Sequence, residues 1–239
     1  MRIMFPLLLG SAMLAAAPAH AGLTLQYTRM IMTAPQSQST LRVWNSEDGP
    51  LLVQTWFDQG DADAAPESVK VPFMVSQPLQ RLEAGANRDI VVRVIGTQGL
   101  PSDRESVVWL NILGAPQKGQ GENQLQATIR QRIKLFWRPA SLPGSAEAAA
   151  GGVSWRWVQQ PEVSHLEARN ASAFHVSIVR LQVGADVIDL SPSAGMLRPH
   201  DTLKVQVPSG FKPSVAQQVK MVWVNDAGKE QETELPLGP

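Results

Sequence analysis

Four cationic side chains recur along one face of a short stretch of this 239-residue chain, RQRIKLFWRP at residues 130–139. Side chains of a β-strand point alternately to its two faces, so residues two apart share a face. The four cations are Arg130, Arg132, Lys134 and Arg138. The apolar Ile133 and Leu135 fall on the opposite face. Charged donors form their strongest hydrogen bonds with anionic groups, although ordinary surface charge is the commoner explanation of such a row.

The charge of the whole chain gives no reason for this row. Lys+Arg and Asp+Glu number 21 each, so no net field attracts nucleic acid or an anionic membrane surface. Any basic site must therefore be local.

The remaining residue types offer little catalytic chemistry. The chain has no cysteine, which excludes thiol catalysis and thiolate metal sites. His165, His175 and His200 lack the spacing of metal ligands. The sequence contains no nucleophile elbow and no glycine-rich phosphate loop. We therefore expect a protein that is not an enzyme and that uses no cofactor and no metal.

The elements that would position these residues have the pattern of short strands separated by turns. Runs rich in β-branched and aromatic residues alternate with polar residues, and 18 Gly and 18 Pro punctuate the chain. About seven such runs precede residue 140, which is typical of a β-sandwich, and a second series follows residue 152. The sequence thus predicts an all-β protein of two domains, residues 22–143 and 144–239.

The stretch between the two series, ASLPGSAEAAAGG at residues 140–152, is rich in small residues. Its alanine tract could form a short helix, but glycine and proline on both sides leave little room for one. We interpret the stretch as the interdomain connection.

The first 21 residues have the pattern of a secretory signal peptide. Arg2 supplies positive charge, an apolar core follows, and Ala19, His20 and Ala21 form a typical cleavage site. Cleavage after Ala21 would leave an exported, soluble chain with no other apolar stretch long enough to span a bilayer. Without disulfides, that chain must form a sufficient hydrophobic core unaided.

Five segments share their order and spacing with one known protein family. They are LQYTRMIM from Leu25, QPLQRLEAGANRDIVVRV from Gln77, LPSDRESVVWLNI from Leu100, RIKLFWRPA from Arg132 and VWVNDAG from Val222. With these segments the chain resembles the periplasmic pilus chaperones, the PapD-like family. Each motif alone is weak, but five in the same order are specific. The resemblance covers most of the chain beyond residue 21 and is closer in the first domain.

This resemblance implies two immunoglobulin-like β-sandwich domains set at an angle, with a cleft between them. Such chaperones bind pilus or fimbrial subunits whose own sandwich lacks a strand, lend an edge strand, and pass the subunit to an outer-membrane usher. The lent strand covers unpaired backbone groups and an apolar groove that would otherwise promote aggregation. The resemblance therefore implies a periplasmic protein whose partners are subunit and usher, with no membrane insertion after signal cleavage.

The same resemblance implies roles for individual residues. Arg29 and Lys134 match the two cations that bind the C-terminal carboxylate of the subunit. Arg138 matches an interdomain ion cluster with Glu105 and Asp226, which sets the angle between the domains. The two remaining arginines of the row are expected to be solvated until a partner covers them. As independent surface charges, any of these groups would contribute little to stability.

The donated strand would run from Asn123 to Leu135. Leu125, Ala127 and Ile129 share one face and would fill successive pockets of the subunit. The family usually has bulky aliphatic residues at all three positions, so Ala127 is a departure that suggests a shallow pocket in the subunit. The same alternation is compatible with core residues of the chain's own sandwich. An exposed donor edge would also permit self-association.

A second class of function is an exported two-domain immunoglobulin-like module that is itself part of a fibre or an adhesin. A fibre subunit would need an N-terminal extension of alternating apolar residues ahead of its sandwich. Here strand-like sequence begins directly after the predicted cleavage site. This favours the chaperone.

Overall fold

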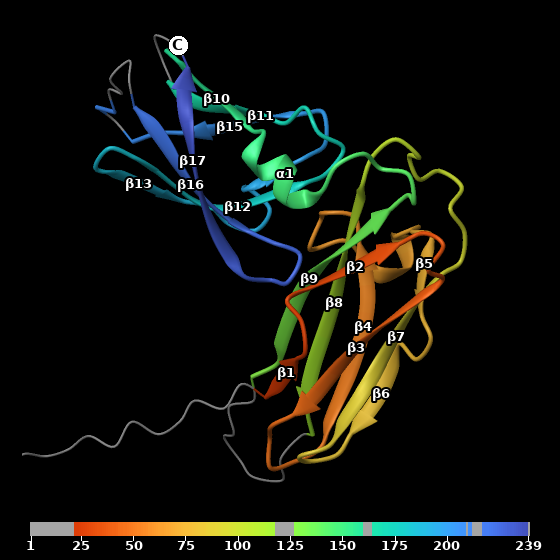
Figure 1. Ribbon diagram of the computed structural model, residues 1–239. Coiled ribbons are helices and arrows are strands. Elements are labelled where there is room, and N and C mark those ends of the chain that lie inside the picture. Colours follow the sequence, from red (N-terminus) through yellow and green to blue (C-terminus); the bar gives the residue numbers. More distant parts are fainter. Residues whose placement is uncertain (1–21, 118–126, 160–163, 209, 212–216, 239) are drawn as a thin grey trace, which may run out of the picture.

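Two β-sandwich units follow one another along the chain and meet at an angle (Figure 1). The computed structural model describes residues 22–117, 127–159, 164–208, 210–211 and 217–238. Among these residues there is one α-helix, and almost all other regular structure is strand. The predicted all-β fold of two sandwiches is confirmed. No helix in the described ranges is long and apolar enough to cross a membrane.

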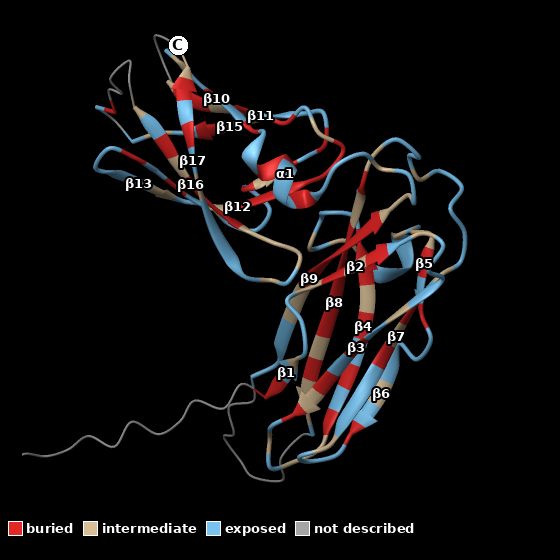
Figure 2. Ribbon diagram, viewed as in Figure 1, coloured by how far each residue is buried: buried red, intermediate tan, exposed pale blue. Residues whose placement is uncertain are grey.

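The first unit packs a four-stranded sheet, in the order β1-β3-β7-β5, on a five-stranded sheet in the order β2-β9-β8-β4-β6. Its strands are β1 (Leu23–Leu25), β2 (Arg29–Thr33), β3 (Gln38–Asn45), β4 (Leu51–Asp58), β5 (Phe73–Val75), β6 (Leu79–Leu82), β7 (Asn87–Val94), β8 (Ser106–Pro116) and β9 (Ile129–Arg138), with a 3₁₀ helix at Pro66–Ser68. Strands of both sheets carry buried residues (Figure 2), and the side chains of these residues form one core.

The strands form where apolar side chains recur at every second position. In β4, Leu51, Val53 and Phe57 are buried in the core, whereas Leu52 and Gln54 between them are exposed. This alternation sends one face of the strand to the core and the other to the surface.

Strand β9 carries the row of cations and has an incomplete set of neighbours. It pairs antiparallel with β8 from Ile129 to Trp137. On its other side it pairs in parallel with β2, but only from Lys134 to Arg138. The chain ahead of β2 has left for the other sheet, where β1 pairs with β3. Residues 129–133 of β9 therefore have an edge that no described strand covers.

The second unit is built from one path of strands, in the order β13-β12-β16-β17-β10-β11-β15, with β14 beside β12. A short parallel pairing of β10 with β17 joins its two halves. The elements are α1 (Ala146–Gly151), β10 (Ser154–Val158), β11 (His165–Arg169), β12 (Val176–Val183), β13 (Asp186–Asp189), β14 (Met196–Leu197), β15 (Thr202–Gln206), β16 (Gln218–Val224) and β17 (Glu230–Gly238). They enclose a second core, distinct from that of the first unit.

The alanine tract between the units is helical, so the expectation that its flanking glycine and proline leave little room for a helix is wrong. Ser145 caps α1, because its Oγ accepts a hydrogen bond from the Ala148 amide at 3.1 Å. Ala146, Ala149 and Ala150 are buried in the second core. The flanking glycines delimit the helix rather than prevent it, and small side chains let it lie against β12 and β17.

Candidate functional site

Arg29 and Lys134 lie side by side where the two units meet. Arg29 begins β2 and stands opposite Lys134 of β9 in the parallel pairing of these strands. Both line a cavity of about 260 Å³, whose walls also include Trp109 from the first unit and Ser177 and Val224 from the second. The structure thus brings together the two cations to which the motifs assign one role.

The Lys134 ammonium is held in a buried position. Only 7% of the residue is exposed. Its Nζ donates to Ser177 Oγ at 3.2 Å and lies 5.1 Å from the centre of the Trp109 ring. Burial, and then the charges of Arg29 and Arg132, lower the pKa of Lys134 from 10.5 to about 7. An anion in the cavity would favour the charged form and oppose this shift.

The Arg29 guanidinium is also partly buried, and one of its donors is unused. Its Nη1 donates to the main-chain oxygen of Val224 at 2.7 Å, and its centre lies 5.7 Å from the middle of the Phe136 ring. No described group accepts a hydrogen bond from Nε, although that atom is buried. Burial lowers the pKa of Arg29, while Asp226 and Glu105 oppose the change. A guanidinium nevertheless stays charged.

This arrangement suits the binding of a single carboxylate. A planar guanidinium and an ammonium on neighbouring strands can donate charge-assisted hydrogen bonds to the two oxygens of one group. Such bonds are stronger in a partly buried cavity than in bulk water. Glu230 also lines the cavity, but it is exposed and neither cation bonds to it among the described contacts.

Arg132, two residues before Lys134, is not solvated as expected. Its guanidinium donates to both carboxylate oxygens of Asp58, at 2.8 and 2.5 Å, and lies 3.9 Å from the centre of the Trp109 ring. Asn111 donates to the same carboxylate at 2.7 Å. Burial would raise the pKa of Asp58, but the bonds from Arg132 and Asn111 lower it overall. Arg130 is exposed, yet it too has a partner, the main-chain oxygen of Ala62 at 2.8 Å.

Glu105, Arg138 and Asp226 form a cluster across the junction of the units. Arg138 Nε donates to Glu105 at 2.6 Å, and its two terminal nitrogens donate to Asp226 at 2.6 and 2.8 Å. Burial alone would lower the pKa of Arg138, but the bonds to Asp226 and Glu105 raise it. Arg138 and Glu105 belong to the first unit and Asp226 follows β16, so these ion pairs connect the two domains.

His175 is a fourth member of this cluster that motif reasoning missed. Its Nδ1 lies 2.7 Å from Glu105 Oε1, and its main-chain amide donates to the same oxygen at 2.9 Å. The Glu105 amide in turn donates to Ala173. Glu105 is therefore held from both domains. The contact joins residues 70 positions apart, and the sequence carries no local signal for it.

The proposed donor strand is only partly within the described residues. Leu125 lies outside them, and Ala127 is exposed just ahead of β9. Ile129 opens β9 with 41% of its surface exposed, so it is not a core residue. It lines a groove of about 500 Å³ together with Leu25 and Tyr27.

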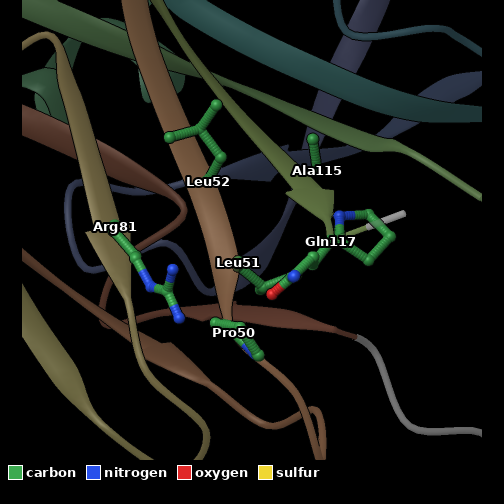
Figure 3. A pocket seen from close by; sticks show the side chains of 7 residues that line it. Pro50, Leu51, Leu52, Arg81, Ala115 and Gln117 are labelled. Atoms are coloured by element: carbon green, nitrogen blue, oxygen red, sulfur yellow. The ribbon is translucent and has the colours of Figure 1, made fainter. Parts of the chain in front are cut away.

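A third hollow, of about 250 Å³, lies on the first unit (Figure 3). Pro50, Leu52, Arg81 and Ala115 line it, at the ends of β4 and β8 and beside β6. Leu52 is 47% exposed, and Leu79 on β6 is 59% exposed.

Comparison with known proteins gives matches to both halves of the chain. Residues 22–143 match the family described as pili and flagellar-assembly chaperone, PapD N-terminal domain, and residues 148–235 match the pili assembly chaperone PapD, C-terminal domain. The chaperone protein FimB/FhaD of Bordetella pertussis is 36% identical over 228 residues, which cover 92% of this chain and 91% of that protein.

Solved structures of chaperones have the same fold. The crystal structure of the YadV chaperone has a TM-score of 0.75 and 29% identity, covering 90% of this chain and all of that one. The SafB chaperone in complex with the SafA pilin of Salmonella enterica has a TM-score of 0.75 and 27% identity, covering 92% and 99%.

Proposed function

The chain belongs to the PapD family of pilus-assembly chaperones, and we propose that it captures a pilus subunit by lending it β9 and by binding its C-terminal carboxylate with Arg29 and Lys134. The alternative, a module that is itself part of a fibre, is disfavoured because the relatives of this chain are named as chaperones.

One observation supports the proposal most directly. The uncovered edge of β9 at residues 129–133 ends where Arg29 and Lys134 face each other. A subunit strand that pairs with this edge would come to its end at the two cations. Since the anchored end is a C-terminus, that strand must run parallel to β9, in line with β2. Main-chain hydrogen bonds along the edge would supply affinity, and the ion pairs would fix the register.

The apolar side chains of the lent strand would fill the groove left by the missing strand. Ile129 is exposed at the start of this edge, and Ala127 precedes it. In this proposal both side chains, together with Leu125, enter the subunit, and the small side chain of Ala127 matches a shallow pocket. Burial of such side chains contributes roughly 1.5–3 kcal/mol each for the larger ones.

We also propose where the protein acts and what each part of the chain does. Residues 1–21 direct export to the periplasm and are removed, residues 22–143 form the subunit-binding domain, and residues 144–239 form the second domain. An outer-membrane usher receives the subunit. In this proposal the usher contacts the chaperone at a surface outside the subunit site, such as the hollow around Leu52 and Arg81.

Co-purification with a pilus subunit tests the carboxylate role. We expect Arg29→Ala and Lys134→Ala each to reduce the captured subunit by about tenfold or more, because hydrogen bonds to charged groups contribute about 1.5–3 kcal/mol each. Arg88→Ala and Lys70→Ala remove exposed charges of the same domain and serve as matched controls. Undiminished capture by either site variant, with the protein folded, would contradict the proposal.

A further inference from the structure

The cations of β9 and β2 differ in the kind of group that holds them. Arg132 is neutralised by Asp58, and Arg138 by Glu105 and Asp226. Lys134 and Arg29 are held by uncharged oxygens instead, Ser177 Oγ and the main-chain oxygen of Val224. Both of these oxygens belong to the second domain. Among the described contacts no carboxylate bonds to either cation, so both are available to an anionic ligand, in a position that the second domain determines.

From this contrast we propose that Ser177 is a positioning residue of the carboxylate site, holding the Lys134 ammonium in the cleft before the subunit arrives. The inference rests on the proposed function of that site and extends it to the second domain. Lysine has a flexible four-carbon stem, so its ammonium needs a fixed acceptor to be preorganised.

The surroundings of Ser177 fit this role. The residue is 3% exposed on β12, and its Oγ lies 3.2 Å from Lys134 Nζ. Among the described residues, Ser177 is the only hydrogen-bond acceptor of this ammonium. A hydroxyl also carries a proton that it can donate. Because Ser177 lines the same cavity, that proton is available to the incoming carboxylate.

An uncharged acceptor is what this position requires. A carboxylate within hydrogen-bond distance of Lys134 would pair with it, as Asp58 does with Arg132, and would repel the carboxylate of the subunit. An apolar residue would leave the buried ammonium without an acceptor and favour its neutral form. The hydroxyl stabilises the charged form and leaves the charge uncompensated. The other charged groups facing Lys134 are Arg29, Arg132 and, at the exposed wall of the cavity, Glu230.

The neighbouring strand of the second domain, β16, holds Arg29. Val224, whose oxygen accepts from Arg29, immediately precedes the turn that carries Asp226. Gly228 closes this turn with φ of +76° and packs so near Thr28 that a Cβ there would collide with the threonine hydroxyl. Docking of the second domain therefore positions both cations together.

Ser177→Val and Ser177→Thr form a matched pair, since the two side chains are nearly isosteric and only threonine keeps the hydroxyl. The Lys134 titration is followed by NMR of the side-chain nitrogen in the full chain without a subunit. We expect Val to lower the titration midpoint by about one pH unit, the shift that corresponds to one lost hydrogen bond to a charged group, and Thr to preserve it. Ser177→Ala, which adds no volume, replaces the Val variant if that variant does not fold.

Capture of a co-expressed subunit is the second readout. We expect the Val variant to capture several-fold less subunit than the Thr variant near pH 7.5 and to approach it near pH 5, where Lys134 is charged in both. A loss that is equal at both pH values, or an unchanged Lys134 midpoint, overturns the positioning role. If Lys134→Ala also leaves capture intact, the carboxylate role itself fails, so the two failures are distinguishable.

Discussion

Lys134 carries its charge into a cavity where two arginines stand nearby. Because folding lowers the pKa of Lys134 from 10.5 to about 7, the folded chain binds fewer protons than the unfolded chain between these pH values. The contribution of this residue to stability therefore rises with pH across that window and is least favourable below about pH 7, where the buried ammonium is charged. A bound carboxylate would offset this unfavourable term, because it supplies the missing opposite charge.

Subunit binding should consequently depend on pH in the opposite direction. The ammonium must be charged to bind a carboxylate, and a midpoint near 7 leaves about a tenth of it charged at pH 8. We expect affinity for a subunit to fall by up to about tenfold between pH 6 and pH 8. Titration of the purified complex by fluorescence anisotropy would measure this. Lys134→Arg, which stays charged throughout, is the control and should flatten the profile; a flat profile in the unaltered chain would refute the role of Lys134.

For individual residues, the sequence predicts those that occur in local motifs and misses their partners that are distant along the chain. Arg29 and Lys134 are recognisable because each lies in a characteristic strand segment. Asp58 and Ser177 are not, because their contacts with the cations depend on strand register and domain docking. Hence the expectation that Arg132 is solvated was wrong: its counter-ion lies 74 positions away.

Strand β9 is an edge strand along half of its length. Uncovered edges are hazards for aggregation, and this one is short, about five residues, and flanked by the charged side chains of Arg130 and Arg132. A short edge with charged side chains is less prone to indiscriminate pairing.

Ile129→Asp tests whether this edge enters the subunit. Since Ile129 is 41% exposed in the free chain, an aspartate there should change the free energy of unfolding by less than about 0.5 kcal/mol. In a complex, the same carboxylate would be buried in an apolar pocket, so we expect capture to fall at least tenfold. Val187→Asp, an exposed apolar position of the second domain, is the control and should capture normally. Equal capture by both variants would mean that β9 is not donated.

The strands themselves follow from the alternation of apolar residues, and the sequence predicts most of them. The short helix α1 was missed because six residues are too few to show a helical period, and its glycine neighbours resemble a flexible connection. What stabilises α1 is tertiary, the burial of its alanines against the second core.

Across the whole molecule, a few polar contacts connect the two domains. Glu105 accepts from Arg138 of its own domain and from His175 of the other, with 1% of its side chain exposed. The ion pair of Arg138 with Asp226 completes the link.

Arg138→Ala should both destabilise the protein and alter its shape. Removing one partner leaves the Glu105 carboxylate buried with less compensation, which typically costs about 3–5 kcal/mol. We expect a decrease of that order in the free energy of unfolding and a changed small-angle scattering profile. Arg180→Ala breaks an exposed pair with Asp189 and should cost at most about 1 kcal/mol with no change in scattering. Scattering identical to that of the unaltered chain would show that the cluster does not set the angle.

The two series of strands predict two domains. The resemblance of the motifs to a known family also predicts three members of the ionic cluster between them. The depth of the cavity and the part that the second domain plays in it are not foreseeable, because they arise from the junction of surfaces that share no sequence pattern.

The parallel pairing of β2 with β9 has a consequence for the length of the subunit strand that this site would accept. If a subunit strand continues the line of β2 and stops at Arg29 and Lys134, these two cations fix the position of its last residue. The register of every earlier residue of that strand then follows from its distance in sequence to the C-terminus. Alternate residues of a strand face opposite ways, so a client longer by a single residue would turn every inward side chain outward. Such a chaperone would distinguish clients by the number of residues between groove and chain end, whatever the chemistry of the side chains in between.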